Sequence, residues 1–366
     1  MKTYKNLYEK CLEEETIRQA IHNAAKRKTK KPFVQRVLKN EDYYVKRIKT
    51  ILEKQAYKPR LPGSDVITEG TRRKERTIHK VGFFDQCAQH VVVLAIEKVL
   101  KTGMYEFSCG SVPGRGPHYG KKRIRRWITR DYKGTKYCCQ MDIKKFYPSI
   151  DQTVLKNKLS RKIKDDRMLK LLFDIIDSCE NGLPLGFYTS QWLANFLLQD
   201  LDHYIKEKLK VKYYVRYLDD LIIFGPNKKQ LHKARQAIAE YLEKELHLKM
   251  KEKYQVFRFI YEKAGKIRGR ALDFMGFRFF REKITLRKCL MLKISRKARR
   301  IAKKPRPTYR DAAAMLSYIG WVKNTNTYGF YTNWIKPYID VKQLKEIVSK
   351  HQRKENKRNE AKLAPC

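Results

Sequence analysis

Residues 213–225 read YYVRYLDDLIIFG. Two adjacent acids, Asp219 and Asp220, lie between two runs of apolar, β-branched and aromatic residues. This pattern predicts a strand, a tight turn and a second strand, with both carboxylates at the tip of the hairpin. Unpaired acids at the end of a buried strand are costly, so a divalent cation, which prefers oxygen ligands, is their natural partner. An ordinary acidic turn is the alternative for the dipeptide alone.

A third acid, Asp142, lies in the stretch 140–151, which reads QMDIKKFYPSID. The β-prone residues just before it predict that Asp142 ends a strand, far enough from Asp219 in sequence to belong to a separate strand of the same sheet. Tyr147, which follows Phe146, can close the floor of a sugar pocket and exclude a 2′ hydroxyl; a packed core aromatic is the alternative. The three acids together predict a site for divalent cations.

Five other stretches, taken with these two, make the chain resemble a reverse transcriptase over roughly residues 57–290. They are RRKERTI at 72–78, SCGSVPGRG at 108–116, LPLGFYTSQWLAN at 183–195, LHLKMKEK at 246–253 and DFMGF at 273–277. Each stretch is weak alone, but together they follow the order of the family's motifs. The resemblance implies an RNA-directed DNA polymerase, a nucleotidyltransferase that binds both RNA and DNA.

The resemblance also implies roles for individual residues. Asp142, Asp219 and Asp220 are the expected catalytic residues and ligands of two Mg²⁺ ions, for which Mn²⁺ can substitute. The backbone carbonyl of Ile143 is expected to assist at one ion. The expected nucleotide-binding residues are Lys74, Arg76, Tyr147, Leu185, Gly186, Gln191 and Lys253. The expected template- and primer-binding residues are Arg115, Phe274, Met275, Gly276 and Phe277.

The form of one motif narrows the subfamily. Leu185 precedes Gly186 where most reverse transcriptases carry Gln, and the motif ends in Ser190-Gln191. This LGxxxSQ form resembles the enzymes of diversity-generating retroelements, within the group II intron-like superfamily. Apolar contacts discriminate less steeply than polar ones, so the loss of a Gln agrees in direction with error-prone copying. A neutral packing substitution is the alternative for Leu185 alone.

The subfamily resemblance implies mutagenic retrohoming. The enzyme would copy a template-repeat RNA with its flanking spacer into cDNA that is mutated at adenines, and this cDNA would diversify a target gene. The partners would be this RNA, a primer with its growing cDNA, the dNTPs and an accessory variability protein that forms a pentameric barrel. Together these components would form a ribonucleoprotein. Two alternatives stay open: a non-diversifying bacterial reverse transcriptase (defence-associated, retron-like or intron-derived), and an RNA-binding, maturase-like protein.

The composition agrees with a nucleic-acid partner. Among 366 residues, 84 are Lys or Arg and 38 are Asp or Glu, for a formal net charge of +46. Such an excess favours binding to a polyanion, because contacts with phosphates release counterions. No apolar run is long enough to span a bilayer, and the first residues lack an apolar signal region, so we expect a cytoplasmic protein without a membrane partner. The eight cysteines form no CxxC pair, which argues against a structural zinc site.

The predicted organisation is an α+β, right-hand polymerase fold. Residues 1–56 are expected to form an N-terminal helical extension, and residues 57–135 the fingers. Residues 136–286 would form a ferredoxin-like palm with an antiparallel sheet and helices over 155–179, 191–209 and 228–246. A helical thumb over 287–340, with a helix at 308–322, and a basic C-terminal tail over 341–366 complete the chain.

Overall fold

The computed structural model describes residues 2–60, 63–69 and 74–363, without the side chains at 64, 67–69, 74, 76–77 and 355–363. The chain divides into two compact units. One comprises Met1–Gly120 and Lys133–Phe257, and the other comprises Lys121–Tyr132 and Arg258–Cys366.

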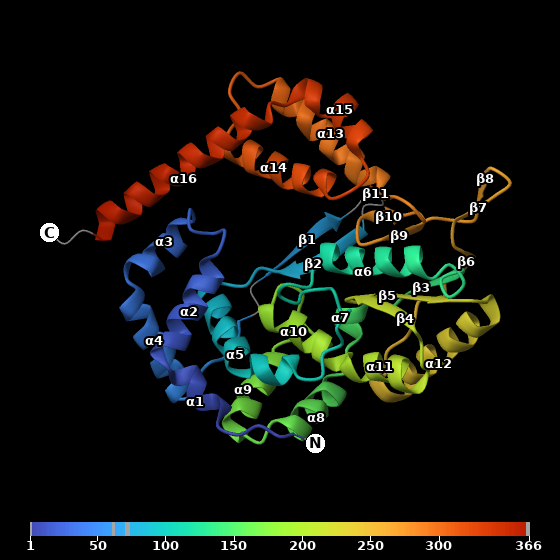
Figure 1. Cartoon of the computed structure of the whole chain (residues 1–366). Coiled ribbons are helices and arrows are strands. Elements are labelled where there is room, and N and C mark those ends of the chain that lie inside the picture. Colours follow the sequence, from blue (N-terminus) through green and yellow to red (C-terminus); the bar gives the residue numbers. More distant parts are fainter. Residues whose placement is uncertain (1, 61–62, 70–73, 364–366) are drawn as a thin grey trace. The chain divides into compact units, whose positions relative to one another are not determined.

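A four-stranded sheet, which apart from Arg258 lies within the first unit, holds the hairpin predicted from the sequence (Figure 1). Its order is β4 (Tyr213–Tyr217), β5 (Asp220–Gly225), β3 (Tyr137–Asp142) and β6 (Gln255–Arg258). β5 pairs antiparallel with both β4 and β3. Nearly every side chain of β4 and β5 is buried, which explains why both strands read as continuous apolar and aromatic runs rather than as alternating ones.

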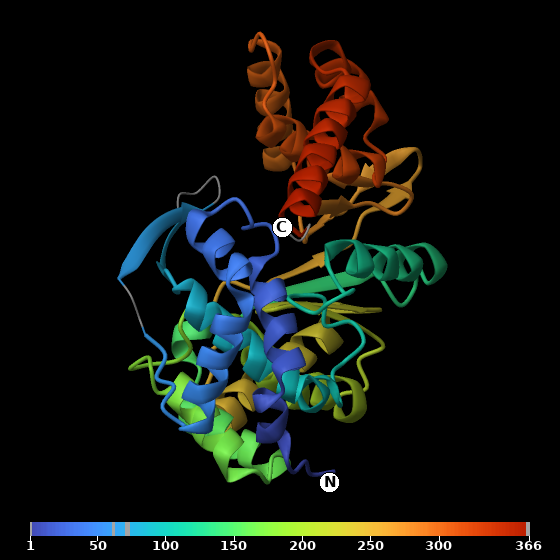
Figure 2. The ribbon, with the colours of Figure 1, turned by 90° about the vertical axis from the view of Figure 1, so that its left-hand side faces the viewer.

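The helices of the first unit share one apolar core with this sheet. α5 (Phe83–Lys101) packs against α2 (Glu14–Ala25) and α10 (Tyr188–Leu197). Figures 1 and 2 both show the N-terminal helices, in blue, beside it. α12 (Lys228–Leu246) packs on β3 and β5. The remaining helices are α1 (Leu7–Leu12), α3 (Pro32–Lys39), α4 (Glu41–Glu53), α7 (Phe146–Ser149), α8 (Gln152–Lys162), α9 (Asp166–Ile176), α11 (Gln199–His203) and the π-helical turn η1 (Tyr204–Lys208). A separate hairpin is formed by β1 (Ser64–Glu69) and β2 (Lys74–His79).

The second unit combines small antiparallel sheets with helices. β9 (Leu272–Phe274), β10 (Phe277–Phe279) and β11 (Ile284–Leu286) form one sheet, and β7 (Tyr261–Lys263) pairs with β8 (Lys266–Arg268). The helical elements are α13 (Lys288–Ala302), α14 (Tyr309–Lys323), α15 (Tyr328–Trp334), η2 (Lys336–Tyr338) and α16 (Val341–Leu363). α6 (Pro117–Arg130) joins this unit from residue 121 onward. A capping box between Thr308 and Asp311 begins α14, because each side chain accepts a hydrogen bond from the other residue's backbone N–H.

The structure refines several predicted elements. The single helix expected over 155–179 is two helices, because α8 ends at Lys162 and Asp165 caps α9 by accepting from the amide of Met168. The helix expected from residue 191 begins at Tyr188 and continues through α11 into η1. The expected helix over 228–246 is confirmed as α12. Among the helices in the described ranges, none is long and apolar enough to cross a membrane. The proposed borders of fingers, palm and thumb stay predictions.

Candidate active site

The β4–β5 hairpin ends in a two-residue turn made of Leu218 and Asp219. The predicted strand, turn and strand are present; Asp219 lies in the turn, and Asp220 begins β5, where it pairs with Tyr217. Leu218 has φ 56°, in the left-handed region that residues with a side chain seldom adopt. Tight two-residue hairpins require such a backbone at their first position, so the turn keeps a strained residue next to the two acids.

The end of β3 brings the third acid to the same place. Asp142 lies opposite Asp220 in the antiparallel pairing of β3 and β5. The backbone N–H of Ile143 donates to the carbonyl of Asp219 at 3.1 Å, which ties the end of β3 to the tip of the hairpin. Three acids from two distant parts of the chain therefore meet at one end of the sheet.

The electrostatics of this cluster are unfavourable without a cation. Burial, together with the like charges of Asp219 and Asp142, raises the pKa of Asp220 to about 7, and the Lys251 ammonium opposes the rise. A bound cation would favour the ionised form, because carboxylates bind metals only after losing their protons.

Lys251 is the site residue that sequence reasoning missed. Its Nζ lies 2.5 Å from Oδ1 of Asp142, and its backbone N–H donates to the Asp142 carbonyl at 2.9 Å. The neighbouring Met250 forms a β-bridge with Ile143, which fixes this segment beside β3. Lys253, the lysine expected near the nucleotide, is exposed. The alternation of lysines at 249, 251 and 253 was the only local signal, and it does not distinguish among them.

The donor chemistry of the cluster fits hard divalent cations, since all three side chains offer carboxylate oxygens. Within residues 2–60, 63–69 and 74–363, however, no three His, Cys, Asp or Glu side chains converge closely enough to hold a metal ion as they stand. One oxygen of Asp142 is instead paired with the Lys251 ammonium.

The predicted sugar-pocket and LPLG residues lie on connected segments. The backbone N–H of Leu183 donates to the carbonyl of Tyr147 at 2.9 Å, and Tyr147 is half-buried. The carbonyl of Leu185 accepts from the backbone N–H of His79, at the end of β2, at 2.8 Å. Gly186 has φ 116°, and a Cβ there would lie 2.3 Å from the His79 carbonyl oxygen. The LPLG loop is therefore held between the β1–β2 hairpin and the segment that follows Asp142.

The other residues that were expected to contact the nucleotide or the template differ in how exposed their side chains are. Gln191 is exposed on α10, and Arg115 is half-buried with its Nη1 donating to the Tyr105 carbonyl at 3.0 Å. Lys74 and Arg76 lie in β2, but their side chains fall outside the described part of the chain.

The expected primer-binding stretch lies in the second unit. Phe274 and Phe277 are buried there, while Met275 and Gly276 form the turn between β9 and β10 with φ 51° and 85°. The Phe277 ring stacks on Trp321 with centroids 5.1 Å apart. Contact with nucleic acid at this stretch would therefore have to come from the turn rather than from the two Phe side chains.

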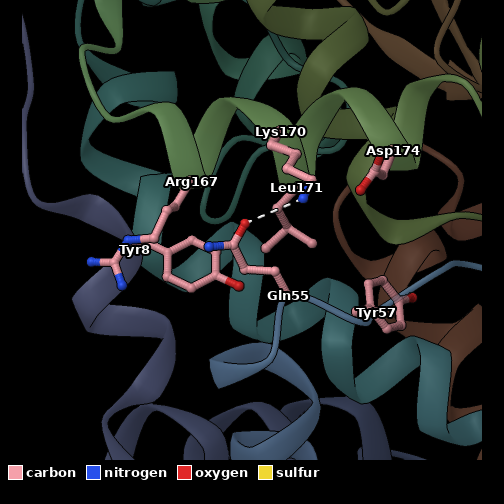
Figure 3. A pocket seen from close by; sticks show the side chains of 7 residues that line it. All are labelled: Tyr8, Gln55, Tyr57, Arg167, Lys170, Leu171 and Asp174. Carbon is pink, nitrogen blue, oxygen red and sulfur yellow. Dashed lines mark hydrogen bonds between the residues drawn. The ribbon is translucent and has the colours of Figure 1, made fainter.

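A small cavity elsewhere in the first unit is not a competing site. Its volume is about 10 Å³, and its lining includes Tyr8, Tyr57 and Asp174 but none of the expected site residues (Figure 3). The ammonium of Lys170 donates to Gln55 across one side of it at 3.4 Å. Such a volume holds at most about one water molecule.

Comparison with known proteins identifies the family. Residues 45–279 match the family described as reverse transcriptase (RNA-dependent DNA polymerase). The chain belongs to the reverse transcriptase family. The α+β polymerase fold predicted for this reverse transcriptase is thereby confirmed, and its three clustered acids lie inside the matched region.

Curated relatives of this reverse transcriptase include two kinds of mobile-element protein. The chain is 27% identical over 179 residues to the group II intron-encoded protein LtrA of Lactococcus lactis, covering 46% of this chain and 29% of that protein. It is 34% identical over 101 residues to the retron Ec73 reverse transcriptase of Escherichia coli, covering 24% of this chain and 32% of that protein. The chain thus spans about a third of the length of these relatives.

A solved structure of apo telomerase from Candida tropicalis is also similar to this reverse transcriptase. It matches at a TM-score of 0.48 and 13% identity, covering 80% of this chain and 56% of that one.

Proposed function

We propose that this chain is an RNA-directed DNA polymerase whose reaction takes place at the Asp142, Asp219 and Asp220 cluster. The observation that carries the proposal is the meeting of these three acids at one end of the sheet, within a member of the reverse transcriptase family. The raised pKa of Asp220 supports a role in binding cations, because a buried cluster of like charges without a cation destabilises the fold.

Asp142, Asp219 and Asp220 would hold Mg²⁺, with the backbone carbonyl of Ile143 assisting. When bound, the two ions would activate the primer 3′ hydroxyl and neutralise charge on the triphosphate. Mn²⁺ is a possible substitute.

The remaining roles are proposed for this chain's own side chains. Lys74 and Arg76 would stabilise negative charge on the β- and γ-phosphates as pyrophosphate leaves. The Tyr147 ring would exclude a ribose 2′ hydroxyl, and Leu185 with Gly186 would shape the pocket for the nascent base pair. The residues proposed to complete the nucleotide, template and primer contacts are Gln191, Lys253, Arg115, Phe274, Met275, Gly276 and Phe277.

The finer proposal is that the enzyme belongs to a diversity-generating retroelement. Its support is the LGxxxSQ motif, in which the apolar Leu185 stands on a loop tied to the end of β2. In this role the chain would copy a template-repeat RNA with its spacer into cDNA mutated at adenines. An accessory variability protein, a pentameric barrel, would share the RNA with it.

A second candidate function is that of a non-diversifying bacterial reverse transcriptase, of a retron or an intron. The observation that favours it is the 34% identity to the retron Ec73 reverse transcriptase, together with the match to an intron-encoded protein. Both candidates share the polymerase reaction and differ in copying accuracy.

Sequencing of the cDNA separates the two candidates. The purified chain would extend a DNA primer on an RNA template that carries each base at many positions, with and without a candidate accessory protein. Errors concentrated opposite template adenines would support the diversifying role. Accurate cDNA opposite all four bases would reject that role and favour the retron-like or intron-like one.

A further inference from the structure

The side chain of Arg216, two residues before the turn of the acidic hairpin, is completely buried. Its Nε and Nη2 donate to the two carboxylate oxygens of Asp202, at 2.9 and 2.6 Å. Asp202, on α11, is also fully buried and accepts from the Tyr214 hydroxyl at 2.6 Å. A buried ion pair of this kind stabilises a fold little more than an apolar pair of the same size, so stability alone does not explain it.

The third nitrogen of the guanidinium reaches the hairpin turn. Nη1 of Arg216 donates to the carbonyl of Leu218 at 3.2 Å and to Oδ1 of Asn195, on α10, at 3.0 Å. Leu218 is the strained residue that immediately precedes Asp219. The planar guanidinium of Arg216 therefore connects α10 and α11 to the turn that carries the acids.

A second segment, residues 107–110, also contacts the strand and the turn that contain Arg216 and Leu218. The Arg216 backbone pairs with Phe107 and Cys109, through hydrogen bonds of 3.1 and 2.8 Å. Gly110 follows, and a Cβ there would lie 2.8 Å from the backbone nitrogen of Leu218. Nδ2 of Asn195 donates to the Gly110 carbonyl at 2.9 Å, so this segment and Arg216 share a partner.

We propose that Arg216 is a positioning residue that fixes the Leu218 turn, and through it the carboxylates of Asp219 and Asp220, in the arrangement needed to bind metal. Gly110 holds the turn from the second segment, since only a residue without a side chain permits the close approach to Leu218. The role in metal binding rests on the proposed polymerase function, whereas the mechanical role in the hairpin does not.

The test replaces the three buried polar side chains together, so that the variant still folds. The triple variant Arg216→Met, Asp202→Leu, Tyr214→Phe removes both charges of the ion pair and the Tyr214 hydroxyl together, which leaves neither partner of the pair as an unpaired buried charge. Lys158→Met is the matched control: Lys158 is also a buried cation, but it pairs with Asp200 and donates to the Phe196 and Leu197 carbonyls, and not to the hairpin. Gly110→Ala disturbs the turn from the other side and leaves the ion pair intact.

Two readouts are needed: backbone hydrogen exchange of residues 217–221, and the affinity of the chain for Mn²⁺, measured by calorimetry without nucleic acid. We expect the triple variant and Gly110→Ala to exchange these amides at least about tenfold faster and to bind Mn²⁺ roughly 10–100-fold more weakly, as is usual when support for metal ligands is lost. Lys158→Met should match the parent in both. Parent-like exchange and Mn²⁺ affinity in Gly110→Ala and in a folded triple variant would overturn the proposal.

Extension of a DNA primer on an RNA template, measured beside these two readouts, separates this proposal from the polymerase function. If the parent fails to copy RNA but the variants still lose protection at the hairpin, the polymerase function is wrong and the mechanical role of Arg216 stands. If the parent copies RNA and the variants keep a protected hairpin, the role of Arg216 is wrong and the polymerase function stands.

Discussion

The Nζ atom of Lys251 lies 2.5 Å from Oδ1 of Asp142. This contact places a positive charge inside the cluster of three acids, where a divalent cation is expected. Lys251 therefore acts as the counter-ion of the cluster in the absence of metal, and a metal ion that binds Asp142 has to compete with it.

Replacing Lys251 by Met should make the stability of the protein depend more strongly on bound metal. Without metal, we expect a loss of at most about 1 kcal/mol in the free energy of unfolding, because the pair is partly exposed. The rise in melting temperature on adding Mg²⁺ should be larger than in the parent, since no ammonium competes. Thermal melting with and without Mg²⁺ measures both. Lys253→Met is the control, and an equal effect there would contradict the assignment of Lys251.

The raised pKa of Asp220 predicts a dependence of stability on pH. Its pKa of about 7 in the folded chain lies above the ordinary value of 3.8 for an Asp, so the folded state binds more protons than the unfolded state between these values. Stability is therefore lost as the pH rises from about 4 to about 7. Asp220→Asn removes this loss and should stabilise the metal-free protein at pH 8, by an amount on the order of a few kcal/mol.

Melting curves of the parent and of Asp220→Asn, recorded in a chelator at pH 5 and pH 8, check this prediction. The gain should shrink markedly at pH 5, where Asp220 is already protonated. Asp166→Asn, a change at an exposed acid of α9, is the control and should give no such difference. A gain from Asp220→Asn that is equal at both pH values would contradict the interpretation.

Gly186→Ala should displace the LPLG loop from β2. The new Cβ would lie 2.3 Å from the His79 carbonyl oxygen, and φ 116° strains any residue that has a side chain. Because the loop is proposed to contact the nucleotide, we expect the KM for dNTP to rise at least about tenfold, while the fold is largely kept. Steady-state kinetics of primer extension would measure it. Gly63→Ala, where a Cβ meets no atom within 4 Å, should behave like the parent.

Leu185→Gln should make copying of template adenines more accurate, because a Gln restores a polar contact to the nascent base pair. We expect the error frequency opposite adenine to fall by roughly tenfold and the other frequencies to change little, as measured by sequencing the cDNA. Leu185→Met keeps an apolar side chain of similar size and should leave the error spectrum unchanged. An unaltered spectrum in Leu185→Gln would remove this residue from the explanation.

Local sequence patterns were sufficient to predict the parts of the fold that depend on residues close to one another in the sequence. The hairpin around Asp219 follows from two apolar runs and a short turn, and α12 begins at Lys228 and ends at Leu246, as its apolar spacing predicted. The break between α8 and α9 was missed because Asp165, which caps the start of α9, lies inside an otherwise helical pattern.

Contacts between distant segments could not be predicted in the same way. The choice of Lys251 over Lys253 depends on the bridge between Met250 and Ile143, which no local pattern reveals. The arginine of YYVRY looks like an ordinary strand residue, and its role depends on Asp202, which belongs to a different helix. In both cases the decisive partner is set by tertiary packing and not by local sequence.

The most direct test of the central claim is extension of a DNA primer on an RNA template by the purified chain with dNTPs and Mg²⁺, compared with Asp219→Asn. We predict that the parent makes full-length cDNA, that a chelator stops it, and that Asp219→Asn binds the RNA normally but makes no cDNA. An Asp219→Asn chain that extends the primer as well as the parent would contradict the assignment of the three acids as the active site.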